Sequence, residues 1–537
     1  MFVPELRSWR AARPHVVRVA GAVRPRLARA TAAVRPRIAR LARVTAPRPA
    51  RGTRPRTWRY TAGAATAGLA LAAGVVTAAG PWHATGQRTA ERDRAAALER
   101  TGGADHGHGS GGSGTAAGAP RPAPSAASVL TGLGGAAGPV RAVPAGDGLA
   151  RVLDPLLDDP VLGDRRAAAV ADLTTGERLY DAGAGTALTP ASTTKLATAV
   201  AALSALGPGH RLTTRAALEA GGGELVLVGG GDPTLTARED RENRAGAASL
   251  RTLARETAKA LKKRGLRRVT LSYDTTLYAG TETHPIGVND NLAPVTALMA
   301  DEARTDGSAG GPAPRAADPA ADAARAFARF LRGHGVETTS PGPAKATGRA
   351  RTLAAVSSPP LAALVERMLT DSDNDLAEAL ARHTALAAGK RADFAGASAA
   401  VAARLRSLGL PVPGAAFHDG SGLDRADRLT PGLLTALLVK AADPARPELR
   451  PVLTGLPVAG FTGTLTSRYT DGAAGLVRAK TGTLTGVNAL AGTVVTEDGR
   501  PLAFAFLTSG ATDPQAAQSA LDRAATALAR CGCGERL

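Results

Sequence analysis

The chain changes character near residue 145, and this break confines any hydrophobic core to the residues that follow. Residues 1–60 hold sixteen arginines, several prolines and one acidic residue, and residues 81–144 are rich in Gly, Ser, Ala and Pro. Neither stretch has regularly spaced apolar side chains that a fold could bury. The rest of the 537-residue chain is long enough for a large core or for two or three domains.

The net charge of +20 is concentrated in the basic arm, residues 1–60. The arm repeats AVRPRLAR as AVRPRIAR, and each proline interrupts a helix. A nucleic-acid-binding domain would carry its charge on a folded face, with aromatic side chains for stacking, and this chain is only 3% aromatic. We therefore expect no nucleic-acid partner. The arm is interpreted as a disordered tail, or as a tail held near anionic lipid head groups.

Residues 61–80 form an uncharged stretch whose length matches the hydrocarbon core of a bilayer. Three arginines precede it between residues 54 and 59, and the next Lys or Arg is Arg88. This asymmetry places the N-terminus in the cytoplasm. It predicts a single-pass anchor in the cell membrane, followed by a flexible linker at residues 81–144 and an extracytoplasmic domain. The alternative is a cleaved signal peptide, although so long a basic leader is unusual for one.

From residue 145 the pattern is that of a mixed α/β protein. The segment RAAAVADLTTGERLYDAG predicts two strands about the turn at 174–176, and the C-terminal segment predicts three more, the last two joined through Asp498-Gly499. Terminal strands beside a terminal helix indicate an antiparallel sheet packed against helices. Further strands are predicted within 224–235 and 267–280, and helices before Gly207-Pro208, at 249–264, near 323–334, on either side of a polar break at 371–374, and after Asp513-Pro514.

Cysteine contributes little to the predicted fold. Cys531 and Cys533 are the only two cysteines, and cysteines one residue apart rarely reach ordinary disulfide geometry. We therefore expect the fold to depend on its hydrophobic core rather than on disulfide bonds.

Ser192 and Lys195 stand out at the start of a predicted apolar helix. They are three residues apart, so their side chains can share one face of the first turn. Serine is a weak nucleophile until a base takes its proton, and a buried lysine can serve as that base whereas arginine cannot. The chain has eight lysines against 58 arginines, so a lysine here is informative. The alternative is an N-capping serine beside an exposed lysine.

Two further short motifs accompany this pair. Ser372 and Asn374 lie in the polar break between two helices, where a hydroxyl and an amide can face a cleft; the alternative is an ordinary helix cap. Lys480-Thr481-Gly482 lies on a predicted strand, where the glycine leaves room for a ligand backbone to lie alongside; the alternative is an ordinary strand end. In this order and context, the three motifs are typical of penicillin-recognising serine enzymes.

The sequence resembles the D-alanyl-D-alanine carboxypeptidase/endopeptidase group of penicillin-binding proteins, class C, of peptidase family S13. The likeness covers roughly residues 145–530 and includes PASTTKLATAVAAL, GGGDPTL, HDGSGL and VRAKTGTLTGVNALAG. It implies a β-lactamase/transpeptidase-like α+β fold, an antiparallel sheet flanked by helices. The catalytic domain would occupy 145–210 and 345–537, with one reduced inserted domain at 211–344 and room for only a rudimentary second.

The resemblance also implies roles for the first two motifs. Ser192 would be the acylated nucleophile and Lys195 the base that activates it. Ser372 and Asn374 would relay a proton to the leaving group and bind the substrate amide. The reaction would be attack on the D-Ala–D-Ala bond of a peptidoglycan stem peptide, followed by hydrolysis of the acyl-enzyme. β-Lactams would acylate the same serine, and many members of the group also cut the D-alanyl cross-link.

The third motif would bind the substrate. By the same resemblance, Lys480 and Thr481 would hold the terminal carboxylate, with Gly482 and Thr483 beside them. The backbone N–H groups of Ser192 and Thr483 would form the oxyanion hole. We expect neither a metal nor another cofactor.

Two other functions remain open from the sequence. A serine β-lactamase shares the motifs but needs a carboxylate for deacylation, and the only two glutamates between the second and third motifs, Glu378 and Glu448, are in no recognisable loop. We therefore expect slow β-lactam turnover. A non-catalytic domain that senses β-lactams or cell wall would keep the cleft without the turnover.

Overall fold

The computed structural model describes residues 147–239, 246–469 and 472–531. These residues belong to one compact unit. Within the described ranges, no helix is both long and apolar enough to cross a membrane. The predicted basic arm, membrane anchor and linker all lie outside them.

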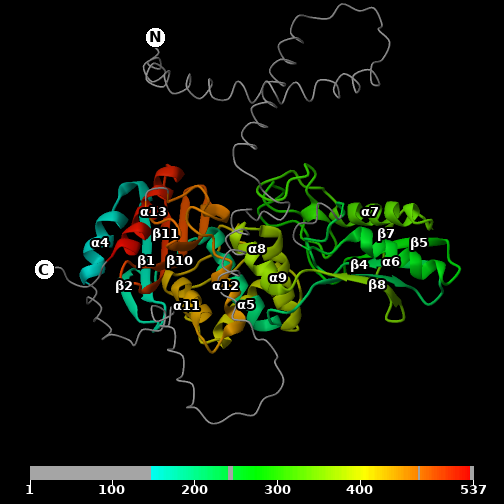
Figure 1. The fold of residues 1–537 in the computed structure, drawn as a ribbon, viewed down its shortest axis with the longest axis horizontal. Coiled ribbons are helices and arrows are strands. Elements are labelled where there is room, and N and C mark those ends of the chain that lie inside the picture. The colour runs from blue at the N-terminus through cyan, green and yellow to red at the C-terminus, as the bar shows by residue number, and fades with distance from the viewer. Residues whose placement is uncertain (1–146, 240–245, 470–471, 532–537) are drawn as a thin grey trace, which may run out of the picture. The chain divides into compact units, whose positions relative to one another are not determined.

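The first of two sheets is antiparallel and has five strands in the order β2-β1-β11-β10-β9 (Figure 1). Its strands are β1 (Arg165–Asp172), β2 (Arg178–Ala182), β9 (Val477–Leu484), β10 (Val487–Val495) and β11 (Pro501–Ser509). The N-terminal hairpin thus pairs with the three C-terminal strands through β1 and β11. The predicted antiparallel sheet is confirmed.

Helices cover both faces of this sheet. They are α4 (Asp147–Leu157), α5 (Thr194–Leu206), α8 (Leu361–Thr370), α9 (Asn374–Ala387), α10 (Phe394–Ser407), α11 (Pro431–Ala442), α12 (Pro451–Thr454) and α13 (Pro514–Arg530). Helices α4 and α13 pack on one face, and α11 packs on the other with α5, α8, α9 and α10 behind it. Short 3-10 turns occur at Pro160–Leu162, Ala191–Thr193 (η2), Asp301–Ala303 (η4), Pro447–Leu449 (η5) and Gly463–Leu465 (η6).

The central strand β11 supplies two separate cores. Successive side chains of a strand point to opposite faces of the sheet. Ala503, Ala505 and Leu507 enter the core beneath α11, whereas Phe504 and Phe506 enter the core beneath α4 and α13. The side of the sheet that faces α11 is therefore lined largely by small residues, which lets the helix approach closely.

A second, mixed sheet lies between the first and second motifs of the sequence (Figure 1). It contains β3 (Thr213–Leu218), β4 (Glu224–Val228), β5 (Arg268–Asp274), β6 (Glu337–Thr338), β7 (Gly342–Pro343) and β8 (Arg351–Ser357). Helices α6 (Leu250–Lys262) and α7 (Pro319–Gly333) pack against it and share its core. Strand β8 pairs with β3 in this sheet, although it lies beyond the insertion predicted at 211–344.

Two local expectations are corrected by the structure. Helix α7 starts at Pro319 rather than near 323, because Asp318 accepts a hydrogen bond from the Ala321 N–H and proline suits the first helical position. Cys531, which follows α13, is disulfide-bonded. Cys533 lies outside the described residues.

Candidate active site

The first motif lies where η2 passes into α5. Lys195 Nζ is 3.0 Å from Ser192 Oγ, and the lysine side chain is completely buried. Thr193 is the N-cap residue of α5 and makes no side-chain capping bond. The alternative of an N-capping serine beside an exposed lysine is therefore wrong, and the hydroxyl and the amine are in direct contact.

The backbone just before the nucleophile candidate is strained. Ala191 has a φ of 47°, in the left-handed region that costs a non-glycine residue about 1–3 kcal/mol. Gly422 packs directly against the Ala191 carbonyl, and no Cβ would fit there. The approach of these two backbones holds Ser192 at the edge of the site.

The second motif lies in the break between α8 and α9, as the sequence predicts. Ser372 also has a left-handed φ, of 59°, and Asp373 caps α9 by accepting the Leu376 N–H. Asn374 Oδ1 accepts a hydrogen bond from Lys195 Nζ at 2.6 Å. The break therefore brings the Asn374 amide onto the lysine of the first motif.

The third motif lies on β9, the edge strand of the first sheet. Lys480 is completely buried, and its Nζ donates to Ser372 Oγ at 2.9 Å and to the Thr481 carbonyl at 2.8 Å. A Cβ on Gly482 would lie 2.7 Å from the Pro190 carbonyl oxygen, so glycine allows β9 to lie against η2. All three motifs are thus joined by hydrogen bonds.

A fourth segment, the turn at residues 419–424, completes the surroundings of Lys195. The Ser421 carbonyl accepts from Lys195 Nζ at 2.7 Å. All but the last residue of this turn lie in HDGSGL, whose sequence alone indicated no role for its residues. The contact was missed because it uses a backbone oxygen, which any residue type can supply.

Burial sets the electrostatics of the site. Desolvation lowers the pKa of Lys195 to about 8, although nearby carboxylates, Asp419 first among them, act in the opposite direction. Burial, together with the positive charges of Lys195 and Arg468, holds the pKa of Lys480 well below its usual value. Lys195 is therefore neutral in a minority of molecules at pH 7 and in about half of them near pH 8, and the neutral amine can accept a proton.

A cavity of about 310 Å³ opens onto these groups. Ser192, Ser372, Asn374, Thr481 and Thr483 line it, while the two lysines lie behind its wall. No sequence motif indicated its other lining residues, which are Asn291, Arg304, Ala309, Gly310, Gly311, Pro312, Arg315, Arg367, Asp371, Asp373, Asp375, Leu423 and Thr464. Many of them come from the Pro/Gly/Ala-rich stretch at residues 304–322, which follows η4. The inserted segment, residues 211–344, therefore forms one wall of the site.

Some ligand-type side chains gather near the site. The two groups are His284, Glu378 and Asp419, and Glu302, Asp373 and Asp375. In the first group His284 and Asp419 are hydrogen-bonded to each other at 2.9 Å. In the second group each carboxylate is ion-paired with an arginine. We assign neither group to a metal.

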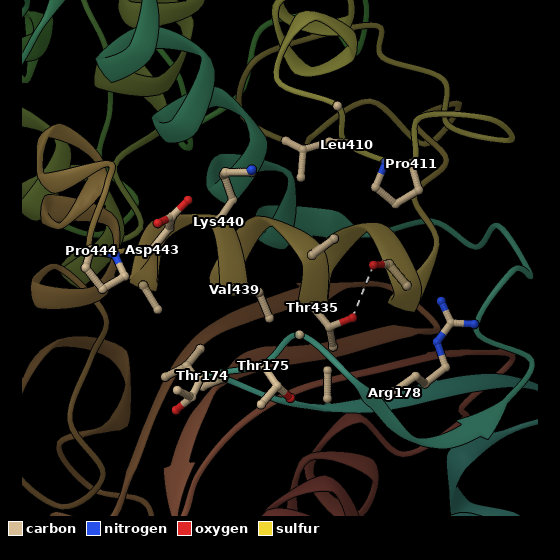
Figure 2. Close-up of a pocket in the computed structure, with 17 residues that line it drawn as sticks. Thr174, Thr175, Arg178, Leu410, Pro411, Thr435, Val439, Lys440, Asp443 and Pro444 are labelled. Atoms are coloured by element: carbon tan, nitrogen blue, oxygen red, sulfur yellow. Dashed lines mark hydrogen bonds between the residues drawn. The ribbon is translucent and has the colours of Figure 1, made fainter.

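A larger cavity, of about 750 Å³, lies away from the motifs. Figure 2 shows it between helix α11 and the turn that joins β1 to β2, with Thr174 and Thr175 on one side and Val439 and Lys440 on the other. None of the three motifs contributes to its lining. The cavity that the motifs line is therefore the candidate active site, although this one is larger.

Known proteins share both the sequence and the fold. The model of the D-Ala-D-Ala carboxypeptidase 3 (S13) family matches residues 149–309 and 311–530. A carboxypeptidase of Mycobacterium tuberculosis is 37% identical over 408 residues, which cover 73% of this chain and 86% of that protein. Carboxypeptidase DacB of Mycolicibacterium smegmatis is 38% identical over 401 residues, with 72% and 85% covered.

The fold has a counterpart among solved structures. Penicillin binding protein 4 (dacB) from Haemophilus influenzae superimposes with a TM-score of 0.58 at 22% sequence identity, over 70% of this chain and 98% of that chain. This confirms the expected α+β fold with its antiparallel sheet and flanking helices. Given this fold, the three joined motifs and the extent of the sequence match, the chain belongs to the D-Ala-D-Ala carboxypeptidase 3 (S13) family of serine peptidases.

Proposed function

We propose that this chain removes the terminal D-alanine of peptidoglycan stem peptides through an acyl-enzyme on Ser192. The observation that carries the proposal is the 3.0 Å contact between Ser192 Oγ and the buried amine of Lys195, at the wall of the cavity that the other two motifs line. A hydroxyl becomes an effective nucleophile when a neighbouring base accepts its proton. Burial supplies that base by lowering the lysine pKa.

In this mechanism the neutral Lys195 takes the proton of Ser192 as the oxygen attacks the carbonyl carbon of the D-Ala–D-Ala bond. The negative charge that develops on the carbonyl oxygen is stabilised by the backbone N–H groups of Ser192 and Thr483. Collapse of the tetrahedral intermediate breaks the C–N bond and releases D-alanine. Water then hydrolyses the ester: Lys195 returns its proton to the Ser192 oxygen, and the proton that the water loses restores Lys480 through Ser372.

The second and third motifs bind the substrate and pass the proton. Lys480 donates to Ser372 Oγ at 2.9 Å, so the serine can hand a proton to the leaving amine and be resupplied by the lysine. Asn374 binds the substrate amide. Thr481, whose hydroxyl donates to Thr464 Oγ1 at 3.0 Å, receives the terminal carboxylate together with Lys480. A D-alanyl cross-link offers the same D-alanyl carbonyl with a different amine as leaving group, so endopeptidase action would use the same groups.

The alternatives have less support. Glu378, one of the two glutamates that a β-lactamase could have used, is buried, and its Oε1 accepts the N–H groups of Gly420 and Ser421. The Glu378 carboxyl therefore helps to hold the backbone of the turn whose Ser421 carbonyl accepts from Lys195. A sensing domain without turnover would need no proton path to a leaving group, yet Lys480 and Ser372 form one.

Covalent labelling tests the proposal. Incubation of the full chain with benzylpenicillin should give one adduct per chain, which peptide mass spectrometry should locate on Ser192. D-Alanine should be released from a diacyl tripeptide that ends in D-Ala–D-Ala. Ser192→Ala should abolish both signals, while Ser204→Ala, a change in the helix α5 that follows η2, should leave them intact. An adduct on another residue, or labelling of Ser192→Ala, would contradict the assignment.

We also propose that residues 61–80 anchor the chain in the cell membrane, with the catalytic domain outside. The support is the uncharged length of this segment and the arginines before it. The full chain should sediment with membranes and resist extraction by alkaline carbonate, whereas a chain without residues 61–80 should not. Extraction of the full chain by salt alone would argue against an integral anchor.

A further inference from the structure

The direction in which the Lys195 lone pair points is set by two hydrogen-bond acceptors. A neutral lysine amine has two N–H donors and one lone pair. The Ser421 carbonyl, at 2.7 Å, and Asn374 Oδ1, at 2.6 Å, can only accept. They occupy both N–H groups, which leaves the lone pair for the hydroxyl of Ser192 at 3.0 Å. The direction of the Lys195 lone pair therefore depends on the positions of the Ser421 carbonyl and of Asn374 Oδ1.

The Ser421 acceptor is held by a turn built around a buried carboxylate. Asp419 accepts the backbone N–H groups of Gly422, Leu423 and Asp424 at 2.6 to 2.9 Å, and also the Ser421 hydroxyl at 2.9 Å. Such a turn keeps its shape only while the carboxylate is ionised and fixed in place, because a protonated or displaced carboxyl would lose acceptor capacity.

His284, from the inserted segment, fixes this carboxylate from behind. Its Nε2 lies 2.9 Å from Asp419 Oδ2, and both side chains are almost completely buried. The Ile286 N–H donates to His284 Nδ1 at 3.2 Å, which leaves the ring proton on Nε2, where it donates to Asp419. The ring also packs edge-on against Phe394, with 5.2 Å between centroids.

The same bond keeps Asp419 charged. Burial alone would raise the pKa of this carboxyl, but the hydrogen bonds from His284 and from the Gly422 N–H hold it well below its usual value. Asp427, on the other side of the turn, has its pKa raised to about 10 by burial and by the charge of Asp419, so it is neutral and can share its proton. Glu378 and Asp424 are the other acidic groups close to His284.

We propose that His284 is a positioning residue for the general base: its bond to Asp419 fixes the turn whose Ser421 carbonyl directs the Lys195 amine at Ser192. This rests on the proposed function, in which Lys195 is the base. A parallel contact supports it, since the Asn291 carbonyl, also in the inserted segment, accepts from Asn374 Nδ2 at 2.9 Å and so orients the other acceptor. The inserted segment thus aligns the reacting groups as well as forming a wall of the cavity.

The test is the rate constant for acylation of the full chain by benzylpenicillin, followed by rapid quench and intact mass. In His284→Ala the rate constant should fall by about 10- to 100-fold, the order of loss that a small misplacement of a reacting group causes. The final yield should remain one adduct per chain, because a molecule that folds still carries Ser192. In His284→Gln, whose amide can donate to Asp419 from a similar position, the rate constant should recover most of this loss.

A merely structural role predicts a different pattern: a lower yield of acylated chain with an unchanged rate constant for the folded fraction. His383→Phe is the matched control, because His383 is another buried histidine between α9 and the inserted segment, in contact with Tyr278 rather than the turn. The acylation rate constant of His383→Phe should match that of wild type.

A rate constant for His284→Ala within about twofold of wild type would overturn the proposal, as would an equal loss in His383→Phe. If His284→Ala does not fold, a His284→Gln rate as low as that expected for alanine would overturn it. Failure of the wild-type chain to acylate at Ser192 would instead refute the proposed function.

Discussion

Lys195 gains its chemistry from burial rather than from its side-chain type alone. An exposed lysine is charged throughout the physiological range, but desolvation lowers the pKa of this one to about 8. The surrounding carboxylates, Asp419, Glu378, Asp373 and Asp375, oppose the effect without cancelling it. An arginine in the same place would keep its proton, so the proposed role of general base requires a lysine at this position of an arginine-rich chain.

The first prediction follows from this pKa. Because acylation requires neutral Lys195, its rate constant should rise about tenfold per pH unit below pH 8 and level off above it. The measurement is the benzylpenicillin acylation rate between pH 5.5 and 9.5, corrected for uncatalysed hydrolysis of the β-lactam. A rate independent of pH from 6 to 8, or one still rising steeply above pH 10, would show that Lys195 is not the titrating base.

At the level of elements, local signals in the sequence predicted the strands of the first sheet and the helices α5, α8, α9 and α13, but not α4, α10, α11 or α12. The turn residues of the β1–β2 and β10–β11 hairpins, the helix stop at Gly207 and the Asp513-Pro514 start all act within a few residues, so they can be recognised without a structure. The pairing of β3 with β8 could not be predicted, because it joins distant, alanine-rich segments with little alternation.

The site divides in the same way. Ser192, Lys195, Ser372, Asn374 and Lys480 could be named because their chemistry requires particular side chains. Three supporting groups could not, namely the Ser421 carbonyl, the Asn291 carbonyl and His284. Two of these act through the backbone, which carries no residue code, and the third comes from a segment whose contact with the turn depends on tertiary packing.

The second prediction concerns the packing of β9 against η2. Gly482→Ala would place a Cβ 2.7 Å from the Pro190 carbonyl oxygen and 3.1 Å from the Ala191 Cβ. The strand must then move away from Ser192, which should slow acylation by about 10- to 100-fold and cost about 1–3 kcal/mol of stability. Acylation kinetics and thermal unfolding measure both effects.

Gly342→Ala provides the control for this change. Gly342 lies in β7 of the second sheet, and a Cβ there would meet nothing within 4 Å. Its acylation rate should equal that of wild type. An unchanged rate in Gly482→Ala would mean that β9 can shift without disturbing the site.

On the scale of the whole molecule, a buried ring contact joins the inserted segment to α9. His383, on α9, packs edge-on against Tyr278 of the inserted segment, and among the described residues its Nε2 has no hydrogen-bond partner. Burial, aided by the nearby His210, lowers the pKa of His383 to about 4. The ring is therefore neutral in the folded protein.

The third prediction is a pH dependence of stability. The unfolded chain binds a proton at His383 near pH 6.5, whereas the folded chain resists it until about pH 4. The free energy of unfolding should therefore fall by about 3 kcal/mol at this residue as pH decreases from 6.5 to 4. Urea unfolding of wild type and His383→Phe at several pH values isolates the term. Parallel stability curves for the two proteins across this window would refute it.

The unequal faces of β11 have a consequence for how faithfully the site is assembled. Ala505 is aligned with Ala491 of β10, which is aligned in turn with Lys480 of β9. A slip of one residue along β11 would drive Phe504 and Phe506 into the narrow space under α11, and the same slip in β9 would turn the ammonium group of Lys480 away from Ser372. The bulky side chains of Phe504 and Phe506 thus select the correct strand register, because a misaligned sheet would clash with α11. The register of the sheet in turn fixes the position of Lys480.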